Sequence, residues 1–82
     1  MVITEFGPQF EKTFKKIKSV SLKNQLKKQI ANIIEDPEIG KPMRYSRKGT
    51  REVYLNPLRL SYAYKKEENK IIFLGIYHKD EQ

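Results

Sequence analysis

Apolar residues in the first half of the chain recur with the period of an α-helix. A short stripe of this kind consists of Phe10, Phe14 and Ile17. A longer stripe consists of Leu22, Leu26, Ile30, Ile33 and Ile34. Ser21 is the expected N-cap of the second helix. That helix should end by Asp36, because Pro37 disfavours helical geometry at the residue before it. The pattern predicts two amphipathic helices joined as an antiparallel hairpin.

Alternation of apolar and polar residues marks the rest of the chain as β-structure. Residues 1–6 read as a short strand ahead of the first helix, and residues 50–55 and 58–64 alternate after the second. Residues 71–77 are apolar at nearly every position, which is typical of a central strand buried on both faces. The polar segment 65–70 reads as the loop of a hairpin.

The order of these elements predicts an α+β fold. An N-terminal strand is followed by the antiparallel helix hairpin and then by three antiparallel strands, and all the strands form one sheet. Both helices cover one face of that sheet, and its other face is partly open. Eighty-two residues leave room for one domain, spanning residues 1–82.

The charge of the chain indicates a class of partner. The 17 basic and 10 acidic residues give a net charge of +7. Such an excess favours binding to a polyanion or an acidic protein. The chain has no cysteine and one histidine, which excludes disulfides, a thiolate nucleophile and a two-histidine metal site, so we expect neither metal nor cofactor. It lacks a membrane-length apolar run and a signal-peptide pattern, which predicts a soluble cytoplasmic domain.

The densest positive charge lies in residues 41–51, where no acidic residue occurs. Guanidinium and ammonium groups interleaved with Tyr45 suit contacts to phosphates and stacking on bases. The candidate RNA-binding residues are Lys41, Arg44, Arg47, Lys48 and Arg51. The alternative interpretation is a solvated surface loop.

Arg59 is the first candidate for chemistry. It alternates with the apolar residues of its strand and therefore shares a face with Ser61 and Ala63. Small neighbours leave space around a guanidinium, as a phosphate-binding cleft requires. An ordinary arginine on the surface of a sheet would fit the pattern equally well.

His78 is the second candidate, because the unperturbed pKa of histidine lies near neutrality and suits proton transfer. Counted in steps of two, it shares a face with Ile72, Leu74 and Ile76, although a strand buried on both faces makes this count a weak guide. A lone histidine at a strand end is often structural. Tyr54 and Glu52 share a face and are able to add a hydroxyl and a carboxylate to the same cleft.

Elimination leaves a metal-free phosphodiester reaction among the enzymatic possibilities. The sequence has no Ser-His-Asp or Cys-His arrangement, no P-loop, no dinucleotide-binding turn and no EF-hand loop. RNA is cleaved by its own 2′-hydroxyl where a protein supplies alignment, cations around the phosphorane and a proton for the leaving oxygen.

In this order of elements the chain resembles the RelE/ParE superfamily of bacterial and archaeal type II toxins. The resemblance covers nearly the whole length and rests on three segments: 40–44, which reads Gly-Lys-Pro-Met-Arg; 58–62, which reads Leu-Arg-Leu-Ser-Tyr; and 76–79, which reads Ile-Tyr-His-Lys. It implies a ribosome-dependent mRNA endoribonuclease without a metal, neutralised by an acidic, partly disordered cognate antitoxin.

The resemblance also implies roles for single residues. Arg59 would stabilise the phosphate transition state, His78 would act as acid or base as in the YoeB- and YafQ-like branches, and Lys79 would take the terminal basic position of RelE. Tyr54 is a further candidate in the site. RelE-like enzymes carry lysines where this chain has Glu52 and Tyr54, and the tyrosine near their C-terminus has no counterpart here. Two alternatives stay open: a ParE-like inhibitor of DNA gyrase without enzymatic activity, and a non-toxic basic RNA-binding protein.

Overall fold

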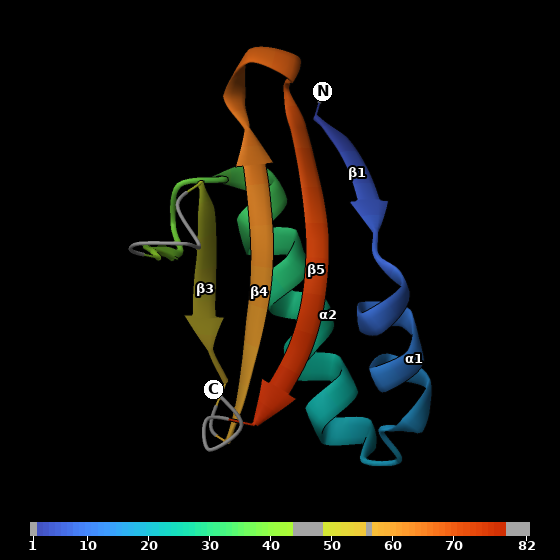
Figure 1. Ribbon diagram of the computed structural model, residues 1–82. Helices are drawn as coiled ribbons and strands as arrows, with labels where there is room; N and C mark the ends of the chain where they lie inside the picture. Colours follow the sequence, from blue (N-terminus) through green and yellow to red (C-terminus); the bar gives the residue numbers. More distant parts are fainter. Residues whose placement is uncertain (1, 44–48, 56, 79–82) are drawn as a thin grey trace.

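The computed structural model describes residues 2–43, 49–55 and 57–78, and Figure 1 shows the path of the chain. In chain order the elements are β1 (Ile3–Phe6), α1 (Pro8–Lys16), α2 (Val20–Glu35), β2 (Lys41–Pro42), β3 (Thr50–Tyr54), β4 (Leu58–Lys65), the 3₁₀ turn η2 (Lys66–Glu68) and β5 (Lys70–His78). The predicted strand, helix, helix and three-strand order is therefore confirmed, with β2 as an addition.

The sheet has five strands in the order β1-β5-β4-β3-β2. Strand β1 pairs in parallel with β5, and the other neighbours pair antiparallel. The predicted α+β class is confirmed. The short strand β2 was not predicted, because two residues are too few to show a period and its edge position is set by pairing with β3.

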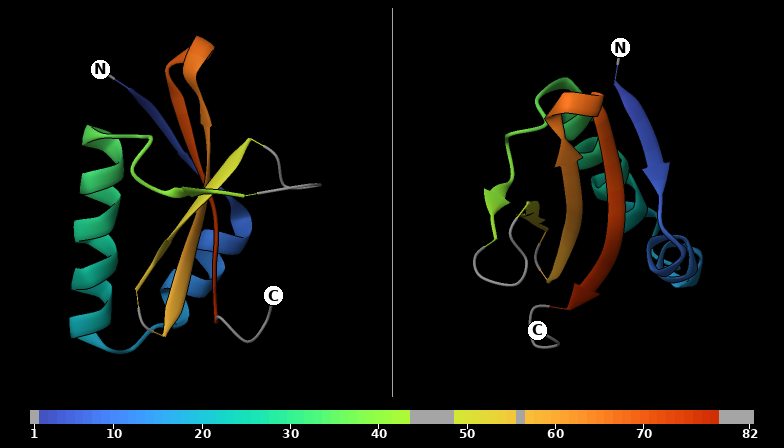
Figure 2. Two further views of the ribbon diagram at one scale, coloured as in Figure 1. Left: turned by 90° about the vertical axis from the view of Figure 1, so that its left-hand side faces the viewer. Right: turned by 45° about the horizontal axis from the view of Figure 1, so that its top comes forward.

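The hydrophobic core lies between α2 and the sheet, with α1 closing it beside β5. Its fully buried side chains come from α2, β4 and β5: Leu26, Ile33, Leu60, Tyr62, Ile71, Phe73 and Ile76. Seen along the sheet, α2 lies on one side (Figure 2, left). No helix among the described residues packs over the opposite face as α2 does over the first.

Helix α2 begins earlier than the sequence predicted. The side chain of Ser19 accepts a hydrogen bond of 3.1 Å from the Leu22 backbone N–H, which makes Ser19 the N-cap. The predicted cap, Ser21, is wrong and lies inside the helix. Both serines precede the same apolar stripe, so the stripe did not distinguish them. Neither helix of the described residues has the length and apolar character that a membrane crossing requires.

Strand β5 contains a β-bulge that the sequence analysis did not predict. Ser61 pairs with Gly75, but the next residue of β4, Tyr62, pairs with Phe73, which leaves Leu74 as an extra residue. Leu74 is 36% exposed, so the prediction of a strand buried on both faces is wrong. The bulge changes which residues share a face. Ile76 is buried in the core together with Phe73, and the count that grouped Ile76 with Leu74 fails.

Tyr62 ties the end of α2 to the sheet. Its hydroxyl donates to the Pro37 carbonyl at 2.8 Å and accepts from the Gly40 N–H at 2.9 Å. The phenol approaches so closely that a Cβ at Gly40 would lie 2.6 Å from its oxygen, which only glycine avoids. Arg51 completes the arrangement by donating to the carbonyls of Gly40 at 2.8 Å and Glu38 at 3.0 Å.

We predict that Tyr62→Phe lowers the free energy of unfolding by about 1–3 kcal/mol, the cost of leaving a buried polar group unsatisfied. The substitution removes the partner of both the Gly40 N–H and the Pro37 carbonyl. Urea unfolding followed by circular dichroism measures the change. Tyr64→Phe, on the same strand and less buried, is the control and should change the stability little. Equal effects of the two substitutions would contradict the role of the phenol.

Burial raises the pKa of the Tyr62 hydroxyl above its usual value of 10.0, although the Gly40 N–H and Arg51 oppose the shift. The unfolded chain therefore loses this proton at lower pH than the folded chain. As the pH rises from about 10 through the raised pKa of the folded state, deprotonation stabilises the unfolded chain relative to the folded one, so the free energy of unfolding should fall in this range.

We predict that the alkaline loss of stability is smaller in Tyr62→Phe than in the wild type. Urea midpoints measured between pH 8 and pH 11 test this. Lys70 also has a raised pKa, owing to its hydrogen bond and ion pair with Glu5, and contributes the same slope to both proteins. The difference between the urea midpoints of the two proteins, plotted against pH, therefore gives the contribution of the Tyr62 hydroxyl. Plots that run parallel would contradict the prediction.

Candidate functional site

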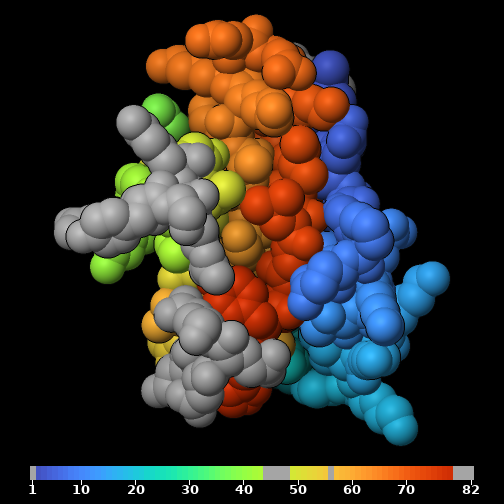
Figure 3. Space-filling model, viewed as in Figure 1, coloured from blue at the N-terminus to red at the C-terminus, as the bar shows by residue number. Residues whose placement is uncertain are grey.

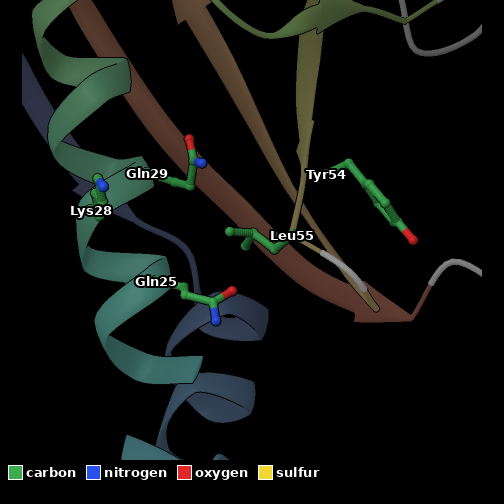
Figure 4. Close-up of a pocket in the computed structure, with 5 residues that line it drawn as sticks. All are labelled: Gln25, Lys28, Gln29, Tyr54 and Leu55. Atoms are coloured by element: carbon green, nitrogen blue, oxygen red, sulfur yellow. The ribbon is translucent and has the colours of Figure 1, made fainter. Parts of the chain in front are cut away.

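Three side chains form a row across the open face of the sheet, near the ends of three strands. Tyr54 of β3 pairs with Arg59 of β4, and Arg59 pairs with Tyr77 of β5. Paired residues in neighbouring strands lie side by side on one face. In Figure 4, Tyr54 points away from α2 while the next residue, Leu55, points toward it. The row therefore lies on the face opposite α2.

Glu52 binds two members of this row. Its Oε1 atom accepts a hydrogen bond from Nη1 of Arg59 at 2.7 Å, and its Oε2 atom accepts one from the Tyr77 hydroxyl. The guanidinium of Arg59 also lies over the Tyr54 ring, 5.8 Å from its centre. A carboxylate, a guanidinium and two phenols thus form one cluster, which we call the open-face cluster: Glu52, Tyr54, Arg59 and Tyr77.

The cluster is polar but partly sheltered from solvent. The side chain of Glu52 is 10% exposed and that of Arg59 is 28% exposed. The buried Nε atom of Arg59 has no hydrogen-bond partner among the described residues, which is rare for a charged group. A partly exposed guanidinium next to a carboxylate suits an anionic ligand that needs both a hydrogen-bond donor and a proton acceptor.

The structure does not place Arg59 and His78 on a common face. His78 is the last residue of β5, is exposed, and pairs with Leu58, which packs against the core. Arg59 pairs instead with Tyr77. Since alternate residues of a strand point to opposite faces, His78 takes a register position on the helix side. Its role as an acid or base remains a prediction.

The basic segment divides into residues with different surroundings. Lys41 is exposed at the edge strand β2. The guanidinium of Arg51 donates hydrogen bonds to the backbone carbonyls of Glu38 and Gly40 and lies 3.9 Å from the Glu38 carboxylate. In this structure it therefore stabilises the segment that follows α2. The other basic candidates lie outside the described residues: Arg44, Arg47, Lys48 and Lys79. RNA binding by the segment remains a prediction.

Tyr77 is the member of the cluster that the sequence analysis did not single out. Counting in steps of two from the buried residues of β5 places Tyr77 with Ile71 and Phe73 in the core. The bulge at Leu74 reverses this. A glycine inside an apolar strand often marks a bulge, so Gly75 was the available signal.

A hollow of about 340 Å³ lies between α2 and the end of β3. Its lining consists of Gln25, Lys28, Gln29, Tyr54 and Leu55, shown in Figure 4. It opens on the helix side and is lined mainly by long polar side chains. No group of three His, Cys, Asp or Glu side chains in the described part of the chain is placed to hold a metal ion.

Comparison with solved structures defines the class of the fold. The chain is similar to the Escherichia coli RelBE toxin–antitoxin complex (TM-score 0.80, 19% identity, 95% of this chain and 96% of that one) and to a YoeB/ParE toxin from Agrobacterium tumefaciens (TM-score 0.82, 10% identity, 94% and 98%). It is also similar to YafQ from Escherichia coli (TM-score 0.75, 19% identity, 99% and 97%). At these identities the likeness shows the fold, which is that of RelE-like toxins.

The family follows from the sequence. Residues 4–82 match the family model described as ParE toxin of the type II toxin–antitoxin system parDE. The chain belongs to this family and is a type II toxin of the RelE/ParE superfamily. No curated protein matches the chain.

We predict that Glu52 and Arg59 are energetically coupled. Removing either partner takes the 2.7 Å ion pair away from the other in a sheltered position, so the costs of the two single substitutions should add up to more than the cost of the double one. Urea unfolding of Glu52→Gln, Arg59→Gln and the double variant should give a coupling of about 1–3 kcal/mol. Additive single effects would show that the contact contributes no stability.

Proposed function

We propose that this toxin is an mRNA endoribonuclease that acts on translating ribosomes and needs no metal for the cleavage. One observation carries the proposal: the open-face cluster combines a carboxylate, a partly exposed guanidinium and two phenols on the sheet face opposite α2. Phosphodiester cleavage by an internal 2′-hydroxyl requires these kinds of groups.

In the proposed reaction the 2′-oxygen attacks the adjacent phosphorus and the bond to the 5′-oxygen breaks. Glu52 accepts the proton of the 2′-hydroxyl, and Arg59 stabilises the negative charge that develops on the phosphorane. The leaving 5′-oxygen takes up a proton. Tyr77, which lies in the cluster, and His78, at the end of the same strand, are the two candidate donors.

The proposed partner is an acidic cognate antitoxin, partly disordered when free, that folds on contact with the toxin. The net charge of +7 favours an acidic chain, and the short strand β2 and the strand β1 form the two edges of the sheet. One of the similar structures is a complex of a toxin with its antitoxin, which supports the same kind of partner here. We also propose that the toxin works in the cytoplasm, where translating ribosomes are found.

Inhibition of DNA gyrase without catalysis is the second candidate function, and two observations favour it. The matching family model is that of ParE toxins. In addition, the charge of Arg59 is balanced by Glu52 and His78 takes a register position on the other face, so the described residues do not bring a histidine acid next to Arg59.

We predict that Arg59→Gln and Glu52→Gln each lower the rate of mRNA cleavage by about 10²–10³, the range for loss of an electrostatic stabiliser or a positioned base. Primer extension on a reporter mRNA, with translating ribosomes and purified toxin, measures the rate. Tyr77→Phe and His78→Ala identify the proton donor, since only loss of the true donor should slow cleavage comparably.

Lys27→Gln is the matched control for Arg59→Gln, because it removes one positive charge from an exposed position on α2, far from the cluster. It should leave cleavage unchanged. Circular dichroism and binding to the co-expressed antitoxin confirm that each variant is folded. A supercoiling assay with gyrase runs in parallel. Blocked supercoiling without any mRNA cleavage would overturn the nuclease proposal in favour of the second candidate.

A further inference from the structure

A second hollow lies on the open face, beside the cluster and separate from the one next to α2. It has a volume of about 270 Å³ and is lined by residues of α1, β3, β4 and β5: Gln9, Thr50, Ser61, Leu74, Gly75 and Tyr77. Figure 3 views the molecule from this face, where β4 and β5 run side by side next to α1. The hollow shares Tyr77 with the open-face cluster, so the two sites adjoin.

Small residues create the space. Glu52, Ser61 and Gly75 lie in register across β3, β4 and β5, and the side chains of the last two are short or absent. A Cβ at Gly75 would lie 2.2 Å from Oε1 of Gln9, so the Gln9 amide takes the place of a side chain there. The space that stays open to a planar group lies beside this amide, over the short side chain of Ser61.

Gln9 forms one side of the hollow and is held rigidly. Its Nε2 donates to the Ile76 carbonyl and its Oε1 accepts from the Ile76 N–H, both at 3.0 Å. A primary amide has two donor hydrogens and two acceptor lone pairs, so one of each remains after these bonds. Ser61 adds a hydroxyl that is both donor and acceptor. These donors and acceptors are thus able to form hydrogen bonds with the polar edge of a planar ligand.

The lining also includes an aromatic and an apolar side chain. Tyr77 supplies a ring whose hydroxyl is fixed by Glu52, and Leu74, displaced outward by the bulge, supplies an exposed apolar side chain. An aromatic ring beside a few hydrogen-bonding groups is the usual setting for an unstacked RNA base. The volume lies just below the roughly 300–1,000 Å³ of pockets for drug-sized ligands, and a single nucleobase is smaller than such a ligand.

We propose that this hollow binds one nucleobase of single-stranded RNA next to the phosphate held by Arg59, and so sets the sequence preference of cleavage. The inference rests on the proposed nuclease function and deepens it. Because Tyr77 belongs to both sites, a base stacked on its ring lies within one nucleotide of the cluster. Gln9 and Ser61 are then specificity residues, and Glu52 and Arg59 act on the phosphate.

The test uses the four ribonucleoside 5′-monophosphates as probes of the full-length toxin in ¹H–¹⁵N correlation spectra. At least one nucleotide should shift the backbone amides of Ser61, Gly75 and Tyr77 in the wild-type protein, a result that needs no variant. Ser61→Ile fills the hollow and should weaken that binding about tenfold or more, because base stacking is lost. Ala63→Ile adds the same bulk on the same face of β4, outside the lining, and should bind as the wild type does.

Primer extension with the same variants provides the second readout. Ser61→Ile should relax the base preference at one position beside the cut, whereas Ala63→Ile should retain it. Wild-type spectra in which no nucleotide shifts these amides, or equal binding by the two variants, would overturn the base site. A toxin that binds nucleotides in the hollow but cleaves no mRNA would instead refute the nuclease function and leave the base site standing.

Discussion

The extra residue in β5 decides which side chains meet on the open face of the sheet. Before Leu74 the buried residues of the strand are Ile71 and Phe73, and after it Ile76 enters the core. The change of phase turns Tyr77 toward Arg59 and gives His78 a register position on the helix side. Without the bulge, Tyr77 would compete for core space and Glu52 would lose the hydrogen bond from the Tyr77 hydroxyl.

The bulge is stabilised from outside the strand. Strand β1 pairs with β5 only as far as Phe73, so the next stretch of this edge has no strand neighbour. Helix α1 covers the edge there, and the Gln9 amide bonds the Ile76 N–H and carbonyl as a neighbouring strand would. This explains why an otherwise basic helix carries a glutamine at its N-terminal end, and why Gly75 has no side chain.

The charge distribution separates long-range attraction from local chemistry. Helices α1 and α2 together carry six lysines, whose charge draws the protein toward anionic partners. At the cluster, by contrast, Arg59 is balanced by Glu52 and held near Tyr54. A ligand there meets a guanidinium and a carboxylate side by side among the described residues. Nuclease action and gyrase inhibition would use this surface in different ways, since only the first requires proton transfer.

The sequence by itself determined the order of the elements, their approximate bounds and the polar face that contains Arg59, because these depend on local periodicity and on Pro37 as a helix stop. Its motifs also indicated the toxin superfamily. Only the tertiary structure decided the parallel pairing of β1, the short β2 and the phase of β5 beyond Leu74. These features depend on contacts between residues far apart in the chain, such as Gln9 with Ile76, and such contacts leave no period in the sequence.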